Sequence, residues 1–472
     1  MKHSKALLSG LAVLAALALG APRARAQEDE TQPKPAAKAP LLIGMGQDDA
    51  EQTPANELQP DNRPLTGVQT PTLGSAQFRH SYWVPGLQYG NTTQNFALNQ
   101  ASSGDWTANS YVAGNLSLLE AWSHAQLSMN YSGGGLFSTN SAQGNGYFHQ
   151  LGLVQVFQRQ RWQVLFLDQF SYLPEAQFGF GGAANLSIPG IGGSLGGSLP
   201  GLQNSYVPNQ SILTSAGPRY SNAFATQASY ALSRRGTLTV AGSYGILRFV
   251  EAGNIESDNV NGNVGYDYAL TSEDQLGGVY RFSAYHFAGF PQALGDHSFH
   301  FVYGRKITGR LALQVSGGPE LTTFRIPIGN ISDTLSVSGG ASLSYGFKRG
   351  GLSLSYDHGV SNGGGALIGS STDRVGLDAN RQISREWQMQ GNFGYARNHA
   401  LVTANGQGYD TWFAGAGLSR PLGRNASLSF GYTARIQVSQ LPVCAAGNCS
   451  TSFTQHQISL GFQWHTRPFV IR

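Results

Sequence analysis

The sequence predicts an all-β chain that closes into a transmembrane, antiparallel, up-and-down β-barrel, and three observations predict it. Apolar and polar residues alternate along the chain from about Gly86 to the C-terminus, which is the period of strands with one apolar face. The turns between these segments are alternately very short and long. Charged residues make up only 12% of the chain, about half the usual share for a globular protein. These features favour a sheet whose apolar face is covered by lipid.

The N-terminal residues have the three parts of an export signal. Lys2 and Lys5 give a positive start, residues 6–20 an apolar run, and Ala24-Arg25-Ala26 a small-residue cleavage site. The apolar run is short for a spanning helix, so we expect cleavage of residues 1–26 rather than a membrane anchor. Cleavage removes four basic residues and no acid, which brings the formal charge of +4 close to zero. The charge therefore gives no reason to expect a nucleic-acid partner.

Residues 27–78 differ in composition from the rest of the mature chain. They are rich in Pro, Gln, Asp, Glu and Ala and show no sustained periodicity. Such a composition predicts a disordered acidic tail, which either binds a partner or the cell wall or serves only as a solvated linker. The predicted barrel follows as residues 79–472.

Alternation is clearest in three segments of the predicted barrel. In residues 426–439, Leu, Phe, Tyr, Ala, Ile and Val alternate with Ser, Gly, Thr, Arg and Gln, and residues 335–347 and 260–270 follow the same pattern. Successive side chains of a strand point to opposite faces, so each segment predicts a strand with one apolar and one polar face.

The connections between these segments are of two kinds. The short kind is often basic, as in RQR (159–161), SRRG (233–236) and KRGG (348–351), and the long kind is rich in Gly, Ser and Asn, as in SNGGGALIGSSTD (361–373). Because the kinds alternate, all short turns are expected at one end of the sheet. Successive short turns lie roughly 35–41 residues apart, which fits two membrane-crossing strands, a turn and a loop.

Two other all-β architectures fit less well. A sandwich would present solvated outer faces and needs more surface charge than this chain has. A solenoid would need a repeated residue motif, whereas here only the spacing repeats. A barrel in lipid needs apolar residues outside, polar residues inside and closure without an unpaired edge, which the pattern allows.

From Gly86 onward the chain resembles the porin-like outer-membrane β-barrels of Gram-negative bacteria. The resemblance rests on the alternation, the turn asymmetry, the placement of Trp122, Trp162 and Trp387 at or beside short turns, and the final strand, ISLGFQWHTRPFVIR. It implies an outer-membrane location, with short turns, tail and both termini in the periplasm. The implied partners are outer-membrane lipid and the barrel-assembly machinery. The last residue, Arg472, departs from the usual ending of the family, in which an aromatic residue closes the strand.

The number of strands follows from the alternation of upward and downward strands. Seventeen segments run from Ser110 onward, the first of them down into a short turn, so an upward strand must precede them and residues 87–98 can supply it. The best count is about 18 strands, with 16 to 20 allowed. A barrel of that width usually encloses water.

One long segment interrupts the even spacing. Residues 176–218, after the fifth predicted strand, contain no Asp, Glu, Lys or Arg and many Gly and Pro residues, which argue against an extra hairpin and a count of 20. The flanking hairpin is apolar on both faces near Val154 and Leu165, which leaves an inward patch to cover. The lead-in PEAQFGFGG loosely resembles the start of the inserted loop of enteric porins. We therefore expect this loop to fold into or over the lumen as an uncharged constriction, with Phe178, Phe180, Leu186, Ile188, Ile191, Leu195, Leu199 and Leu202 as its apolar residues.

The alternation also assigns residues to the inward face. Most are amides and hydroxyls, and the few charges either cross-link the wall or act as weak selectivity rings, two alternatives that stay open. The pore-lining candidates are Gln227, Asn261, Asn263, Asp267, Arg281, Gln314, Asp357, Arg374, Asp378, Gln390, Asn392 and Arg435.

The sequence gives little support for catalysis or for a bound cofactor. The neighbouring pairs Asp296-His297 and Asp357-His358 each place their two side chains on opposite faces of a strand, so neither can act as an acid–base pair without a bulge. The 11 histidines form no metal motif. Cys444 and Cys449 are expected to form a local disulfide in an oxidising compartment, and a metal or redox pair is the weaker alternative.

Three function classes remain for a barrel of this kind. The first is a channel for passive diffusion of small hydrophilic solutes through a largely neutral polar lumen. The second is a surface adhesin or receptor, and the third is an export or anchoring component. The outer loops are mostly short and rich in small residues, which favours the channel. The sequence leaves the solute and the presence of a homo-oligomer open.

Overall fold

The computed structural model describes the strands of the predicted barrel and most of their turns. The described residues are 81–98, 106–139, 145–173, 212, 218–250, 254–328, 331–402, 408–439 and 452–471. The predicted signal peptide, the predicted tail, the eight apolar loop residues from Phe178 to Leu202, and both cysteines lie outside them. Within the described residues, no helix is long and apolar enough to cross a bilayer.

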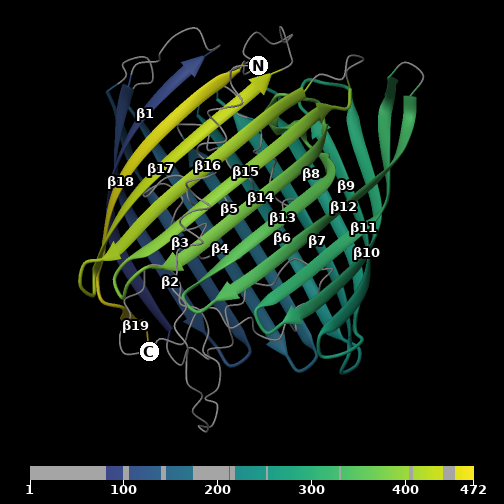
Figure 1. Cartoon of the computed structure of the whole chain (residues 1–472), viewed down its shortest axis with the longest axis horizontal. Helices are drawn as coiled ribbons and strands as arrows, with labels where there is room; N and C mark the ends of the chain where they lie inside the picture. The colour runs from purple at the N-terminus through teal and green to yellow at the C-terminus, as the bar shows by residue number, and fades with distance from the viewer. Residues whose placement is uncertain are drawn as a thin grey trace, which may run out of the picture. The chain divides into compact units, whose positions relative to one another are not determined.

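Strands β1 to β18 form one antiparallel ring in chain order (Figure 1). Each strand pairs with the next along the chain, and β18 pairs with β1 from Gly86↔His465 to Leu98↔Phe453, which closes the ring. The strands are β1 (Ser81–Leu98), β2 (Trp106–Ala121), β3 (Ala125–Ser138), β4 (Gly146–Arg159), β5 (Trp162–Leu173), β6 (Arg219–Ala231), β7 (Gly236–Phe249), β8 (Ser257–Ala269), β9 (Asp274–Phe287), β10 (Ala293–Thr308), β11 (Leu311–Ile328), β12 (Ile331–Phe347), β13 (Gly350–Ser361), β14 (Ser370–Gln382), β15 (Gln388–Ala400), β16 (Gly408–Pro421), β17 (Ala426–Ser439) and β18 (Phe453–His465). The predicted up-and-down barrel of about 18 strands is confirmed.

The C-terminal residues extend the seam of the ring. A short strand, β19 (Phe469–Ile471), continues the line of β18 and pairs with Ser81–Trp83 at the start of β1. The rings of Trp83 and Phe469 stack with their centroids 4.8 Å apart. The first strand therefore begins at Ser81, upstream of the expected residue 87, and is paired along its length.

The direct pairing of β5 with β6 shows that they are neighbours in the wall despite the long chain segment between them. The two strands pair from Trp162↔Tyr230 to Leu173↔Arg219. No further strand of the wall can stand between two strands that hydrogen-bond to each other, so the alternative in which an extra hairpin gives 20 strands is wrong. Residues 174–218 connect two neighbouring strands at their long-loop ends.

The two faces of the sheet differ as the alternation predicts. On β8, Val260, Val264 and Tyr266 are exposed, while Asn261 and Asn263 between them are buried. Trp122, Trp162 and Trp387 are exposed beside short turns, where an aromatic girdle is expected. The outside of the ring is thus apolar with aromatic residues near its short-turn end, and the inside is mostly polar.

Candidate functional site

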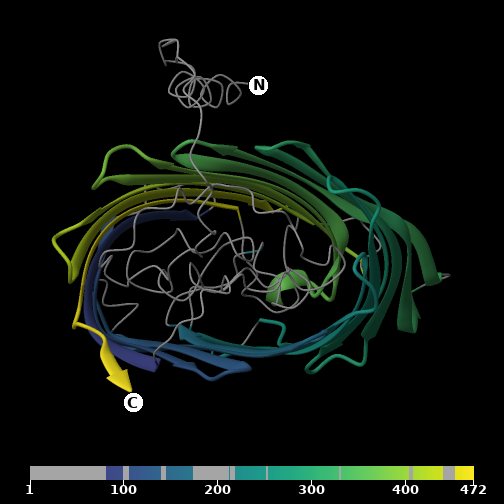
Figure 2. The ribbon, with the colours of Figure 1, turned by 90° about the horizontal axis from the view of Figure 1, so that it is seen from below.

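The connection between β13 and β14 turns into the barrel. It contains a short 3-10 turn, η2 (Gly363–Gly365), which lies within the ring of strands in Figure 2. Gly363, Gly364, Gly365 and Gly369 all have positive φ angles, between 63° and 88°, which residues with a side chain rarely adopt. The sequence marks SNGGGALIGSSTD only as one of several long loops, and its inward direction is a finding of the structure.

Hydrogen bonds join this inward loop, residues 362–369, to the wall several strands away. The Asn362 side-chain amide donates to Ser257 Oγ on β8 at 3.0 Å, and the Ile255 backbone N–H donates to the Gly365 carbonyl at 2.8 Å. Asn362 Oδ1 also accepts from the Gly364 N–H at 3.2 Å. The loop therefore spans the arc between its own strands and β8.

Apolar contacts hold the inward loop on two sides. Ile368 packs against the buried cluster that Tyr285 and Phe287 of β9 form with Leu294 of β10. Leu367 packs against Tyr409 of β16 and against Ile212, which is only 1% exposed. Ile212 belongs to the connection between β5 and β6, so chain segments from two distant connections meet inside the ring.

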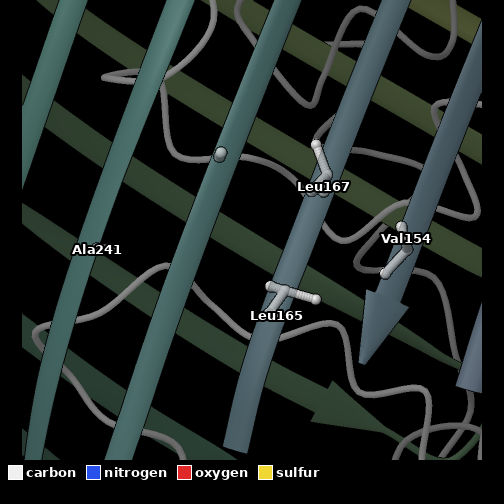
Figure 3. Close-up of a cluster of buried hydrophobic side chains, with 5 residues drawn as sticks. Val154, Leu165, Leu167 and Ala241 are labelled. Carbon is white, nitrogen blue, oxygen red and sulfur yellow. The ribbon is translucent and has the colours of Figure 1, made fainter. Parts of the chain in front are cut away.

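A second apolar area lies on the inner face of β4 to β7. Val154, Leu165 and Leu167 are almost completely buried there with Ala225 and Ala241, and Figure 3 draws this cluster and labels Val154, Leu165, Leu167 and Ala241. These five side chains make this part of the inner face apolar, unlike the polar inner face of β8. It is the inward patch that the sequence predicts beside the long loop, although the predicted covering residues, Phe178 to Leu202, lie outside the described residues.

Charged side chains gather on the inner wall of β9 to β14. Asp357 and Arg374 are directly opposite each other on β13 and β14, and their charges interact. Asp296 and Glu320, both buried, lie close enough to interact with each other, and Asp296 also interacts with Arg281. In strand order, the three acids of this group, Asp296, Glu320 and Asp357, lie between Arg281 and Arg374, so charges of both signs are close together on this part of the wall.

Two buried arginines face each other from distant strands. Arg219 begins β6 and Arg435 lies on β17, yet they are near enough for their like charges to interact. Arg435 also donates to Gln455 Oε1 at 3.3 Å and lies over the ring of Phe413. The two side chains therefore come near each other inside the ring, although their strands are not neighbours in the sheet.

The structure puts all twelve pore-lining candidates on the face opposite the exposed apolar side chains. They lie on eight strands, namely Gln227 on β6, Asn261, Asn263 and Asp267 on β8, Arg281 on β9, Gln314 on β11, Asp357 on β13, Arg374 and Asp378 on β14, Gln390 and Asn392 on β15, and Arg435 on β17. Only Arg281, Asp357, Arg374 and Arg435 take part in the charged groups described above.

Sequence reasoning missed four inward residues, Arg219, Asp296, His300 and Glu320, all of which are buried. The alternation of side chains could have placed each on the inner face, because Tyr220, Phe299 and Leu321, which lie one or three residues away from them, are exposed. The alternation cannot show which of these side chains contact residues on other strands. His300 Nε2, for example, lies 2.7 Å from Ser338 Oγ on β12.

The two neighbouring acid and histidine pairs do not act together. Asp296 is buried inside, whereas His297 is outside with its Nδ1 2.7 Å from the hydroxyl of Tyr280. His358 likewise contacts Asp373 on the outer face at 2.8 Å, and Asp357 belongs to the inner wall. The described residues contain no group of three His, Cys, Asp or Glu that could hold a metal ion.

Comparison with known proteins shows likeness only in solved structures. OpdQ of Pseudomonas aeruginosa has 10% sequence identity and a TM-score of 0.42, with 82% of this chain and 98% of that chain covered. OpdK of the same organism, solved with vanillate, has 11% identity and a TM-score of 0.39 over 81% and 99% of the chains. OccAB3 of Acinetobacter baumannii has 8% identity and a TM-score of 0.41, again over 81% and 99%. Such low values carry no argument about function.

No family model matches the sequence, and no curated protein matches it. The closed ring of β1 to β18 itself is what confirms, at the level of fold, the resemblance to porin-like outer-membrane barrels.

Proposed function

We propose that this protein is an outer-membrane channel through which small hydrophilic solutes diffuse passively. The observation that carries the proposal is a wide closed ring with an apolar outside, a polar inside and a chain segment turned into its interior. An inward loop narrows a channel without closing the wall. A surface receptor or an export component has no need of such an element.

The inward loop, together with Ile212, forms the narrow zone of the proposed channel. Leu367, Tyr409 and Ile212 pack together, so the width left for a solute depends on how firmly this contact holds. Residues 176–218 contribute further to the narrowing in this proposal, with Phe178 to Leu202 covering the apolar inner patch at Val154 and Leu165. The constriction is then largely uncharged, and the charges act from the wall.

The lumen lining in this proposal consists of the twelve candidates together with Asp296 and Glu320. Six of these fourteen side chains are amides, five are acids and three are arginines, and charges of both signs interact on β9 to β14. Such a lining exchanges hydrogen bonds with neutral solutes and gives only weak preference among ions.

Single-channel recording in planar bilayers tests the proposal. The full-length protein should conduct ions in discrete steps. Replacing residues 362–369 by an Asn-Gly hairpin turn should raise the conductance several-fold, because the strands can be joined by two residues and the interior loop is removed. Deleting residues 178–203 should raise it independently.

Variant Asn425→Ala is the matched control, since Asn425 holds a short turn through the carbonyl of His465 and is far from the inward loop along the strands. Its conductance should equal that of the parent. Absence of conductance in all variants, with heat-modifiable electrophoretic mobility showing an intact barrel, would contradict the channel.

A further inference from the structure

An ionic ladder crosses the outside of four neighbouring strands. His358, Asp373, Arg397 and Asp410 are direct cross-strand neighbours in that order on β13, β14, β15 and β16. They share the outward face with Leu354, Tyr356 and Trp412, all of which are exposed. Base and acid thus alternate along a row that the strand register fixes.

Each carboxylate of the ladder is already hydrogen-bonded. Asp373 Oδ1 accepts from the Tyr356 hydroxyl at 2.9 Å and lies 2.8 Å from His358 Nδ1. Asp410 Oδ1 accepts from the Tyr395 hydroxyl at 2.8 Å. These bonds fix the carboxylates and spread their charge.

Arg397 is held less tightly than the acids beside it. Its Nε lies 3.9 Å from Asp410 Oδ1, and the side chain is 49% exposed. A guanidinium presents further N–H groups in a planar fork, which matches two oxygens of a phosphate group. The ladder thus orients a base whose outer edge faces the surroundings of the barrel.

The height of the ladder agrees with the lipid headgroup layer. Its members lie about nine residues from the short-turn ends of their strands, which at about 3.3 Å per residue and a tilt of about 40° corresponds to roughly 23 Å. The apolar band of such barrels is about 25 Å tall, and a charge at its centre costs about 2–4 kcal/mol. The ladder therefore belongs at the outer edge of the band.

Other hairpins have polar pairs at a similar level. The hydroxyls of Tyr131 and Tyr432 lie 2.8 Å from Nδ1 of His149 and His456, on β3–β4 and β17–β18. Tyrosine at the boundary between hydrocarbon and water is typical of membrane proteins. A common outer boundary thus runs around the barrel.

We propose that the outward ladder His358–Asp373–Arg397–Asp410 is a binding site for the phosphate group of a lipid headgroup in the outer leaflet, with Arg397 as its direct ligand. The site rests on the proposed outer-membrane location and is independent of conduction. His399 lies on the same face two residues further along β15 and extends the basic edge. The two tyrosines position the acids and do not contact the phosphate.

Native mass spectrometry of the full-length protein, released from detergent micelles, measures the affinity directly. The probe is phosphatidic acid, and diacylglycerol of the same chains is the comparison without phosphate. The parent should retain phosphatidic acid selectively, and Arg397→Gln should weaken its retention about tenfold, as expected for loss of a charge-assisted bidentate contact. Arg397→Lys should restore part of it.

The chain supplies a matched control in Arg305. Its Nε lies 3.7 Å from Asp274 Oδ1, which also accepts from the Tyr303 hydroxyl. A guanidinium, a carboxylate and a tyrosine hydroxyl thus occur together again near the short-turn end. Arg305→Gln should leave retention unchanged, and equal weakening by both variants would overturn the site.

Three other results would also overturn the proposal. One is full retention of phosphatidic acid in Arg397→Gln, and another is displacement of the lipid by millimolar inorganic phosphate, which would indicate a free-anion site. The third is a change in oligomeric mass without a change in lipid retention, which would assign the face to a second copy of the chain. Conductance of Arg397→Gln should match the parent, so failure of this site and failure of the channel are separate outcomes.

Discussion

At the scale of single residues, the inner charges either cross-link the wall or set the field along the solute path. The pair Asp357 and Arg374 is best suited to distinguish these two roles. They are opposite each other on β13 and β14, yet Asp357 is exposed while Arg374 is buried. An exposed inner carboxylate acts on ions in the lumen, and its buried partner acts mainly through it.

Neutralising Asp357 should therefore shift ion selectivity. Asp357→Asn is expected to move the reversal potential in a potassium chloride gradient toward anion preference, because it removes a negative charge that ions can approach. Arg374→Gln should shift it toward cations, and by less, because Arg374 is buried. Unchanged reversal potentials together with lower thermal stability in both variants would mean that the pair only cross-links the wall.

At the scale of elements, strands were predictable from sequence and the inward loop was not. Residues 426–439 read as a strand and form β17 with the same bounds, because alternation records a difference between lipid and lumen that acts on each residue locally. The direction of the β13–β14 loop depends on contacts such as Asn362 with Ser257, 105 residues apart in the chain. The meeting of Arg219 with Arg435 is nonlocal in the same way. No local pattern encodes such pairs.

A substitution at one glycine should displace the inward loop from its position against the wall. Gly369 has φ +74°, and a Cβ there would collide with the side chain of Leu294 on β10. Gly369→Ala should therefore displace the loop, at a cost of roughly 1–3 kcal/mol, and raise single-channel conductance. Gly423→Ala is the matched control, since Gly423 has φ +77° in a short turn and a Cβ there would meet nothing within 4 Å. Equal conductance in both variants would mean that the loop does not limit the path.

At the scale of the whole molecule, one sheet has an apolar outer face and a mostly polar inner face, which suit lipid and water respectively. The ring closes through β1 and β18, so no strand edge is left within the paired span of the seam. Polar rows that face outward, such as the ladder around Arg397, stand near the ends of the strands and not at their middles. The outward-facing charged residues therefore indicate where the edge of the bilayer lies on the barrel.

That position can be measured with two outward valines. Val264 is 47% exposed near the middle of β8, and Val337 is 70% exposed on the part of β12 far from its short turn. Lysine on the lipid face costs about 2–4 kcal/mol at the bilayer midplane and about 0–1 kcal/mol near the interface. Val264→Lys should thus lower the free energy of unfolding in lipid vesicles by several times more than Val337→Lys, as measured by reversible denaturant titration. Equal losses would place both residues at the same depth, and a larger loss at Val337 would reverse the assigned boundaries of the membrane band.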